Sequence, residues 1–494
     1  MVAGKGKPRM AGTPRTRTDL WAALLSNQRL YGQSFPQGEY DRSEFQRDYD
    51  RIIFSSAFRR LQDKTQVFPL SMSDYTRNRL THSLEVSSAG RTLGTLAGNH
   101  LKTVGVTCVP HEIGTIVATA ALAHDIGNPP FGHSGEAAIQ SWAKHHLLPP
   151  LDGKRRAEGV ITMRTRRCNA LSVLMTPEEL ADFHNFGSNA QGLRILVRTG
   201  IRRRKGGMRP TLATLGAVAK YPRPSLLPNE EKPTSISQKK CGYFQDDRAM
   251  VSKAFRTLGL IEMTQGCFSR HPLAFLTEAA DDACYAIADI EDAYKLGILN
   301  FNDTCEVLFP LATRDKRYSE PAYLRDNASR IGRMRAFALG VLVRECSEVF
   351  RSSFDEIENG KLEVPLLRRT RVTQEYDQII ALAKERVYTH DRVLEIEYAG
   401  YSAIGGLLDM FYAALCDPKD EPKDTKLRRL LPVDLVYRRG QSDPLQHSKY
   451  PFDFYLNLMT PYERLLAVTD YVSGMTDGYA VRLYQRLSGI RLPD

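Results

Sequence analysis

The chain has 494 residues, of which 42% are apolar and 25% charged, and a formal net charge of +11. This composition is typical of a folded globular protein and excludes a disordered or collagen-like chain. The longest apolar stretch that stands out, residues 116–123, is well short of the ~18 residues that a membrane span needs, and the basic N-terminus lacks the apolar segment of a secretory signal. The eight cysteines contain no CxxC pair, which argues against a zinc ribbon or a disulfide framework. We therefore expect a cytoplasmic protein with reduced thiols and no membrane partner.

The first 18 residues differ from the rest of the chain. They carry five basic and no acidic residues among Gly, Pro and Thr, which leaves too little apolar surface to fold. After them, most periodic segments repeat their apolar residues at helical spacing, whereas alternating strand patterns are few and short. The sequence therefore predicts a flexible basic tail at 1–18 and a single all-α domain at 19–494.

Two helical segments in the first third of the chain carry candidate metal ligands. His82 lies in the segment RNRLTHSLEVS, where Leu80 and Leu84 are expected to point into the core. In the second segment an apolar helix runs into the adjacent His124 and Asp125, and a Gly/Pro turn then ends it. Both polar side chains are therefore expected at a helix end, where imidazole nitrogen and carboxylate oxygen suit Mn, Fe, Zn or Mg.

A basic region at about 145–241 separates these helices from the next patterned block. Residues 153–209 contain 13 Lys or Arg against 4 Asp or Glu, and prolines follow at 222, 224, 228 and 233. We interpret the region as an elaborated insertion, and we expect a second mixed-charge loop at 417–426. A basic surplus is usually a solvated face, but it also raises the prospect of a polyanionic partner such as a nucleotide or nucleic acid.

A strongly patterned helix at 271–294 supplies the third candidate segment. Asp281, Tyr285 and Asp289 recur every four residues and therefore share one face of this helix. A buried face with two carboxylates is costly unless a cation or hydrogen-bond donors meet them. Each side chain alone would be read as an ordinary core or surface residue, but together with the adjacent His-Asp pair they favour a metal site.

At this point the sequence resembles a known family. The order His82, His124-Asp125, Asp281 resembles the H...HD...D signature of the HD superfamily of metal-dependent phosphohydrolases. Six segments between residues 51 and 480 further resemble, in order, motifs of the bacterial dGTP triphosphohydrolases: RIIFSSAFRRLQDKTQVFPL, TRNRLTHSLEV, AHDIGNPPFGHSGEAAI, NAQGLRIL, EAADDACYAIADIEDA and YVSGMTDGYA. The resemblance covers nearly the whole folded chain and implies an all-α fold, with an HD-domain helical core that carries large helical insertions.

The resemblance also implies site residues, a reaction and partners. The implied metal ligands, for Mg or Mn, are His82, His124, Asp125 and Asp281; the catalytic pair is His133 and Glu136; the phosphate contacts are Arg79, Lys220 and Tyr221; and the sugar contacts are Gln66, Tyr285 and Asp289. The implied reaction is hydrolysis of dGTP, or of several dNTPs, to the deoxynucleoside and tripolyphosphate by water attack at the α-phosphorus. The implied partners are further copies of the chain in a homo-oligomer, a hexamer built from dimers, and single-stranded DNA.

The residue types suit these roles. An imidazole held by a carboxylate can orient or deprotonate water, or protonate a leaving oxygen, near neutral pH. An aromatic ring packed against C2′ leaves no room for a 2′-hydroxyl, so a ribonucleotide would be rejected. Simpler roles stay open for four residues: hydrogen bonding at a helix start for Glu136 and His133, a surface ion pair for Arg79 and a buried aromatic for Tyr285.

The sequence departs from the family pattern at two places. Family members often have FEGNAQ where this chain has FGSNAQ, residues 186–191, so the role of that loop is open. Asn128 stands where many HD enzymes carry a second His, which is compatible with a single catalytic metal. Two other functions also stay open: an HD phosphodiesterase or nucleotidase that acts on another phosphate ester, and a nucleic-acid-binding regulator with a vestigial HD site.

Overall fold

The computed structural model describes residues 16–30, 42–67, 76–147, 174–198, 207–227, 233, 235–321, 324–416, 422–432 and 452–491. Three predicted features lie wholly or partly outside these residues: the basic tail up to residue 15, much of the basic insertion at 148–173, and the start of the mixed-charge loop at 417–421. The first helix, α1 (Arg17–Leu24), takes in the last two residues of the expected tail.

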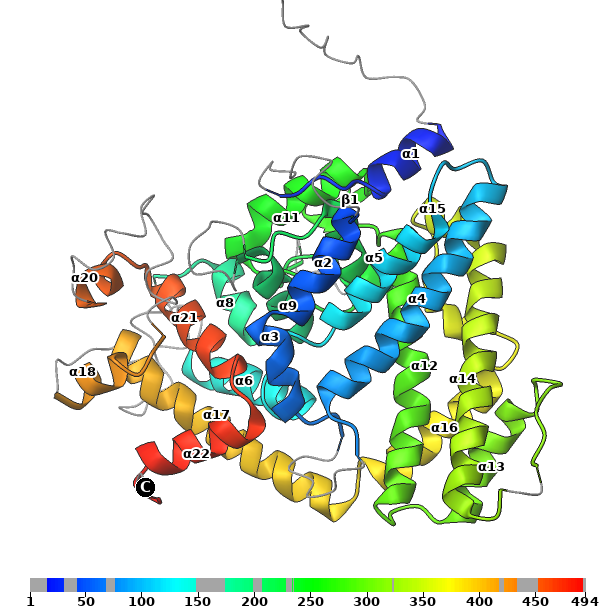
Figure 1. Cartoon of the computed structure of the whole chain (residues 1–494). Coiled ribbons are helices and arrows are strands. Elements are labelled where there is room, and N and C mark those ends of the chain that lie inside the picture. The colour runs from blue at the N-terminus through cyan, green and yellow to red at the C-terminus, as the bar shows by residue number, and fades with distance from the viewer. Residues whose placement is uncertain are drawn as a thin grey trace, which may run out of the picture.

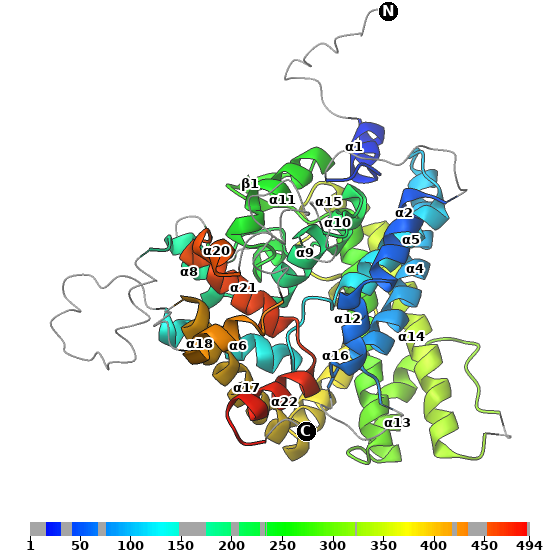
Figure 2. The ribbon, with the colours of Figure 1, turned by 60° about the vertical axis from the view of Figure 1, so that its left-hand side comes forward.

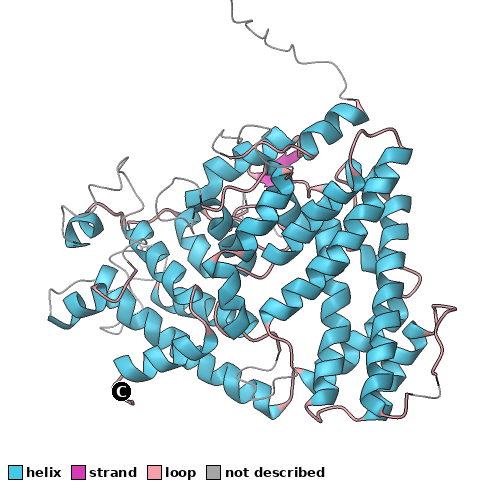
Figure 3. Cartoon of the chain, in the orientation of Figure 1, coloured by secondary structure: helices cyan, strands magenta, loops and turns pink. Residues whose placement is uncertain are grey.

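Helices dominate the described chain (Figure 3). The strands β1 (Glu262–Thr264) and β2 (Cys267–Phe268) form one short antiparallel hairpin, and η4 (Ile236–Gln238) is a single 3₁₀ turn. The all-α prediction is therefore confirmed.

A first hydrophobic core packs the helices that carry the predicted metal ligands. α4 (Arg79–Thr103) and α5 (Pro110–Ala123) lie side by side, and α12 (Pro272–Lys295) and α14 (Asn327–Ser352) pack against α4 (Figure 1). Both α5 and α12 begin with proline at the first helical position, where its missing N–H costs no hydrogen bond. The same core receives residues from α1, α2 (Glu44–Ile53), α3 (Ser56–Arg59), η1 (Arg60–Asp63), α9 (Ser188–Arg198), α10 (Leu212–Val218), α11 (Gln245–Leu258), α13 (Phe301–Ala312), α15 (Phe354–Glu358), η5 (Leu366–Arg369), α16 (Thr373–Leu382) and the π-helical turn η6 (Ala383–Val387).

A second hydrophobic core lies beside the first. α6 (Gly132–His146) and α17 (Asp391–Cys416) pack together, and α21 (Pro461–Ser473) and α22 (Asp477–Leu487) cover α17 (Figure 2). Three short helices complete this side: α8 (Pro177–His184), α18 (Pro422–Arg428) and α20 (Phe452–Asn457). The loop from α5 to α6 crosses between the cores, because Ile126 belongs to the first and Phe131 to the second.

The described part of the predicted insertion is not a separate layer. Its helix α10 packs against α5 and α12 in the first core, and α8 packs against α6 in the second. The insertion therefore contributes to both cores.

One sequence expectation about α4 is wrong. Leu84 is 42% exposed, whereas His82, Ser83 and Val86 are buried. The helix therefore turns its small and polar face toward α5 and α12, and Leu84 points away from that face.

α17 was not singled out in the sequence as an apolar stretch. It has 26 residues and a mean hydropathy of 1.2 over its best window, enough by length and composition for a membrane span. However, 56% of that window is buried inside the protein, against helices such as α6, α21 and α22. Packing in the second core accounts for its apolar composition.

Candidate active site

Three predicted metal ligands converge from three helices of the first core. Nε2 of His82 lies 3.2 Å and Nε2 of His124 lies 3.4 Å from the same oxygen, Oδ1 of Asp281. The ligand atoms of these residues all lie within 4.8 Å of one another. Two imidazoles and a carboxylate at this spacing match the donor set of a divalent transition metal or magnesium site.

The backbone fixes which nitrogen of His124 faces the cluster. Nδ1 lies 2.6 Å from the carbonyl oxygen of Ala121, and a carbonyl only accepts, so Nδ1 carries the proton. In the neutral ring, Nε2 therefore presents its lone pair toward Asp281, an orientation typical of metal-binding histidines. Burial lowers the pKa of His124, but Asp125 and Asp281 outweigh it and raise the pKa to about 9, which shows how strongly this position favours a positive charge.

Asp125 lies beside the cluster, and the guanidinium of Arg79 binds its carboxylate. Its Oδ1 is 3.5 Å from Nε2 of His124, and its Oδ2 accepts a hydrogen bond of 2.7 Å from Nη1 of Arg79. Burial raises the pKa of Asp125, yet Arg79 and His124 outweigh it and hold the pKa at about 2. The pair of Arg79 with Asp125 is buried, which excludes the surface ion pair considered from the sequence.

The turn between the two cores brings the next helix to this cluster. Phe131 and Gly132 have φ angles of 60° and 57°, in the left-handed region. A Cβ on Gly132 would lie 2.2 Å from Nη2 of Arg79, so a side chain here would displace the guanidinium that binds Asp125. α6 then begins, with His133 in its first turn.

His133 and Glu136 do not form the direct pair expected from the sequence. The side chain of His133 reaches the surface, but the protein around the ring removes part of its hydration. This desolvation, together with the charges of Lys240 and Arg79, lowers the pKa of His133. Glu136 accepts hydrogen bonds from the backbone N–H of Ser188 at 2.9 Å and from its hydroxyl at 2.5 Å, and its other oxygen lies 3.6 Å from Nζ of Lys240. Among the described residues no hydrogen bond joins His133 to Glu136, although the charge of Glu136 acts on His133. Ser188 belongs to the FGSNAQ segment, whose last four residues are not a loop but the first turn of α9, so the start of this helix holds Glu136.

Lys220, which is followed by Tyr221, lies close enough to Asp281 for the charge of Asp281 to act on it. Nζ of Lys220 is 3.3 Å from Oε1 of Glu278 and 5.9 Å from the centre of the Tyr221 ring. Burial would lower the pKa of Lys220, but Glu278 and the aspartates beside it raise it, so the ammonium stays charged. The guanidinium of Arg270 lies 5.4 Å from the centre of the Tyr221 ring and donates a hydrogen bond of 2.6 Å to Glu278.

The predicted sugar contacts adjoin a residue that sequence analysis missed. Tyr388 follows the π-helical turn η6, donates a hydrogen bond of 2.6 Å to Oδ2 of Asp289, and stacks on Tyr285 with ring centres 6.1 Å apart. Burial is the largest cause that raises the pKa of Asp289 to about 8. π-Helical turns often occur at functional sites, but this one leaves no signature in the sequence.

Gln66 lies on the segment that follows η1, and its Oε1 is buried without a partner among the described residues. Lys64, also missed by the sequence analysis, is buried and donates to the carbonyl oxygens of Asn128 and, at 3.0 Å, Ser473. Burial lowers the pKa of Lys64 to about 7. The segment 64–66 is thereby tied to the turn that precedes α6.

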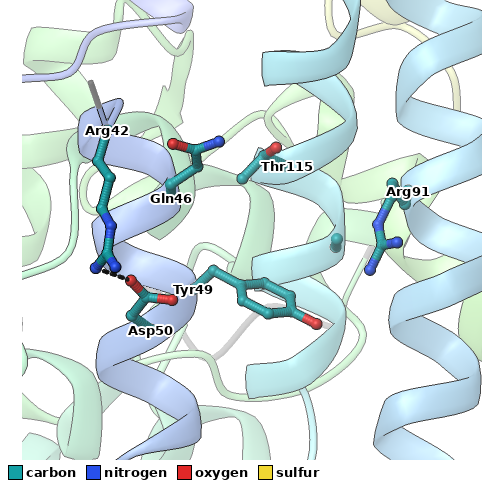
Figure 4. A pocket seen from close by; sticks show the side chains of 7 residues that line it. Arg42, Gln46, Tyr49, Asp50, Arg91 and Thr115 are labelled. Atoms are coloured by element: carbon teal, nitrogen blue, oxygen red, sulfur yellow. Dashed lines mark hydrogen bonds and ion pairs between the residues drawn. The ribbon is translucent and has the colours of Figure 1, made fainter. Parts of the chain in front are cut away.

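A cavity of about 450 Å³ lies elsewhere, between α2, α4 and α5 (Figure 4). It is lined by Arg42, Gln46, Tyr49, Asp50, Arg91, Thr115 and Ala118. None of the twelve predicted site residues lines it, so it is separate from the candidate active site.

The similarity to known proteins agrees with this geometry. The sequence profile described as HD domain matches residues 79–162, and the profile described as phosphohydrolase-associated domain matches residues 453–486. The chain is 38% identical over 478 residues to the deoxyguanosinetriphosphate triphosphohydrolase-like protein of Synechocystis sp., which covers 96% of this chain and 100% of that protein. It is 31% identical over 494 residues to the deoxyguanosinetriphosphate triphosphohydrolase of Serratia proteamaculans, covering 91% of this chain and 94% of that protein.

The chain belongs to the dGTP triphosphohydrolase family of HD-domain phosphohydrolases. The HD domain implies a divalent metal, and the cluster of His82, His124 and Asp281 fits one, because its donor atoms converge and the tautomer of His124 leaves Nε2 toward the cluster. In this chain, the segment that matches the phosphohydrolase-associated domain contains α21 and nearly all of α22, whose buried residues belong to the second core.

Proposed function

We propose that the protein hydrolyses dGTP, and other dNTPs, to the deoxynucleoside and tripolyphosphate. The observation that carries the proposal is the cluster of His82, His124 and Asp281. Lys220 lies nearby, and Glu278, with a smaller contribution from Asp281, raises its pKa so that the ammonium stays charged. A cluster that can bind a metal ion, with the charged Lys220 beside it, suits a substrate with several phosphate groups.

His82, His124, Asp125 and Asp281 would hold the metal, Mg or Mn. When bound, the ion would offset negative charge on the phosphate oxygens and help to activate water. Arg79 supports this site, because its Nη1 holds Asp125 in place and its buried Nε has no partner among the described residues. That N–H is available for a phosphate oxygen.

In the proposed reaction, water adds to the α-phosphorus and the bond between that phosphorus and O5′ breaks. The water loses a proton and O5′ gains one, so a group that accepts and returns a proton is needed. His133 suits this role, because its lowered pKa leaves the imidazole neutral near pH 7 and its ring is exposed at the start of α6. Glu136 supports it through its charge, while Ser188 fixes the Glu136 carboxylate.

The proposed phosphate and sugar contacts lie on α12 and its neighbours. Lys220 keeps its charge beside Glu278 and would bind the outer phosphates. Asp289 would bind the 3′-hydroxyl, with Tyr285 and Tyr388 packed beside the sugar so that a 2′-hydroxyl is excluded. The unpartnered Oε1 of Gln66 is an acceptor suited to a sugar hydroxyl.

Product analysis separates this function from its alternatives. Purified protein is incubated with each dNTP and rNTP and with Mg or Mn, and products are resolved by ion-exchange chromatography. The proposal expects deoxynucleoside and tripolyphosphate, with ¹⁸O from labelled water in the tripolyphosphate, and none of either from His124→Ala. Release of monophosphate or diphosphate would indicate another phosphohydrolase. No turnover of any nucleotide, together with salt-sensitive binding to single-stranded DNA, would favour the regulator.

A further inference from the structure

The motif YVSGMTDGYA near the C-terminus has no part in the proposed reaction. Its residues end α21 and begin α22, and Asp477, at the first position of α22, is 1% exposed. A buried carboxylate is costly unless hydrogen-bond donors surround it, so its partners indicate what it does.

The two carboxylate oxygens of Asp477 serve two distant segments. Oδ1 accepts the backbone N–H of Phe131 at 3.0 Å, across 346 residues of sequence. Oδ2 accepts the backbone N–H of Thr65 at 2.9 Å and the Thr65 hydroxyl at 2.6 Å. Thr65 immediately precedes Gln66, and Phe131 lies two residues before His133. Asp477 therefore joins the segment of a proposed sugar contact to the turn of the proposed proton-transfer residue.

The turn at Phe131 needs such support. A residue other than glycine adopts the left-handed region only at a cost in free energy, and Phe131 has a φ of 60°. Its ring packs on α17, where a Cβ on Gly400 would lie 2.5 Å from the ring. With the ring held by packing and the N–H by Asp477, the backbone keeps the path that brings Gly132 under Arg79 and leads into His133.

Lys64 ties the same three segments a second time. It is 3% exposed, and its Nζ donates to the carbonyl oxygen of Asn128 in the turn and to that of Ser473 at the end of α21. The attachment of α21 and α22 to the turn is therefore polar and specific, and does not rest on apolar packing alone.

We infer that Asp477 is a positioning residue: it fixes His133 and Gln66 for the reaction without contact with the substrate. The inference rests on the proposed function for the reaction that is positioned. It also gives the C-terminal associated segment a defined task at the active site.

Asp477→Asn tests the inference, because asparagine keeps the size but offers an NH₂ donor in place of one acceptor oxygen. One of the two segments then faces a donor instead of an acceptor. We expect kcat to fall by about 10- to 100-fold, with metal content unchanged. Asp48→Asn is the matched control: Asp48 is also buried and accepts a backbone N–H, that of Thr211, but lies on α2. It should lower the melting temperature while kcat per metal-loaded molecule stays at the wild-type value.

Double variants separate positioning from a merely structural role. If Asp477 acts through His133 and Gln66, Asp477→Asn should reduce kcat much less in the background of His133→Ala or Gln66→Ala than in the wild type. Full multiplication of the effects in both backgrounds, or a wild-type kcat for Asp477→Asn, would overturn the inference. Should Asp477→Asn fail to fold, Thr65→Val removes a single hydroxyl donor to Oδ2 and carries the same test in the Gln66→Ala background.

Backbone hydrogen exchange supplies a readout that needs no turnover. Peptides that cover the turn at Phe131 should exchange faster in Asp477→Asn than in the wild type, whereas peptides of α14 should not change. Unchanged exchange at the turn would overturn the inference even if the wild type is active. If the wild type is inactive but the turn exchanges faster in Asp477→Asn, the proposed function is wrong. The conclusion that Asp477 holds the turn then still stands.

Discussion

The hydroxyl of Tyr388 donates a hydrogen bond to Asp289, and Tyr388→Phe removes only the oxygen that makes it. The bond is 2.6 Å long, and the Tyr388 ring stacks on Tyr285 at an interplanar angle of 22°. Phenylalanine keeps the ring and its stacking. The variant therefore tests the orientation of the Asp289 carboxyl separately from the shape of the sugar pocket.

The size of the effect follows from the protonation of Asp289. Burial raises its pKa to about 8, so the carboxyl is mostly neutral at pH 7. A neutral hydrogen bond contributes about 0.5–1.5 kcal/mol, which corresponds to a loss of about two- to twelvefold in kcat/KM for a dNTP. At pH 9 the carboxylate is ionised and the bond contributes about 1.5–3 kcal/mol, so the loss should grow to about 10- to 100-fold.

The loss of kcat/KM in Tyr388→Phe is measured by steady-state kinetics with dGTP, GTP and 2′,3′-dideoxy-GTP at pH 7 and pH 9. The dideoxy substrate is the control, because without a 3′-hydroxyl the orientation of Asp289 should not matter and the loss should disappear. Tyr388→Ala, which also removes the ring, should in addition narrow the preference for dGTP over GTP. A loss in Tyr388→Phe that is equal for dGTP and the dideoxy substrate, or the same at both pH values, would refute the reasoning.

Four further outcomes test the site. His124→Ala and Asp125→Ala should each lose bound metal and turnover while circular dichroism still reports a helical protein; metal content and activity at wild-type levels in either would contradict the assignment. His133→Ala should lower kcat by about 10²–10⁴ without loss of metal, as measured by metal analysis beside kinetics. Mn²⁺ added to chelator-treated protein should raise the melting temperature, and Asp281→Ala should abolish this rise. The folded-state pKa of Asp289, about 8, lies above its ordinary 3.8, so ionisation of this group lowers the stability of the wild type as pH rises between these values. In chelator, the stability of Asp289→Asn relative to wild type should therefore rise by about 1.4 kcal/mol per pH unit near pH 6 and by about half as much per unit near pH 8, measured by denaturant unfolding. A constant difference would contradict the raised pKa.

Much of the ligand cluster could be predicted from the sequence because its signals are local. An apolar helix that stops at an adjacent His124 and Asp125, and a helix that repeats Asp281 and Asp289 on one face, are visible within a few turns. Helical periodicity also predicted the all-α class. It did not predict the orientation of α4, since Leu84 is exposed while small and polar side chains occupy the close contact with neighbouring helices.

The residues that sequence reasoning missed act over long separations. Tyr388 donates its hydrogen bond to Asp289 across 99 residues of sequence. It follows a π-helical turn, which no apolar repeat in the sequence predicts. Lys64 meets Ser473 across 409 residues, and a buried lysine looks like any other lysine in a sequence. The direct pairing of His133 with Glu136 is not formed among the described residues, because Ser188 binds the Glu136 carboxylate, a contact that is evident only in three dimensions. The catalytic roles of both residues stay predictions.

The turn between α5 and α6 crosses from the first core to the second, and it therefore separates two groups of proposed site residues. The proposed ligands His82, His124 and Asp281 lie on helices of the first core or directly at the end of one, whereas α6, which carries His133 in its first turn, packs in the second. In the proposed mechanism the metal ligands and the proton-transfer residue therefore belong to different cores. In that mechanism, a shift of the second core by about 1 Å relative to the first would change the turnover rate substantially while the metal stays bound.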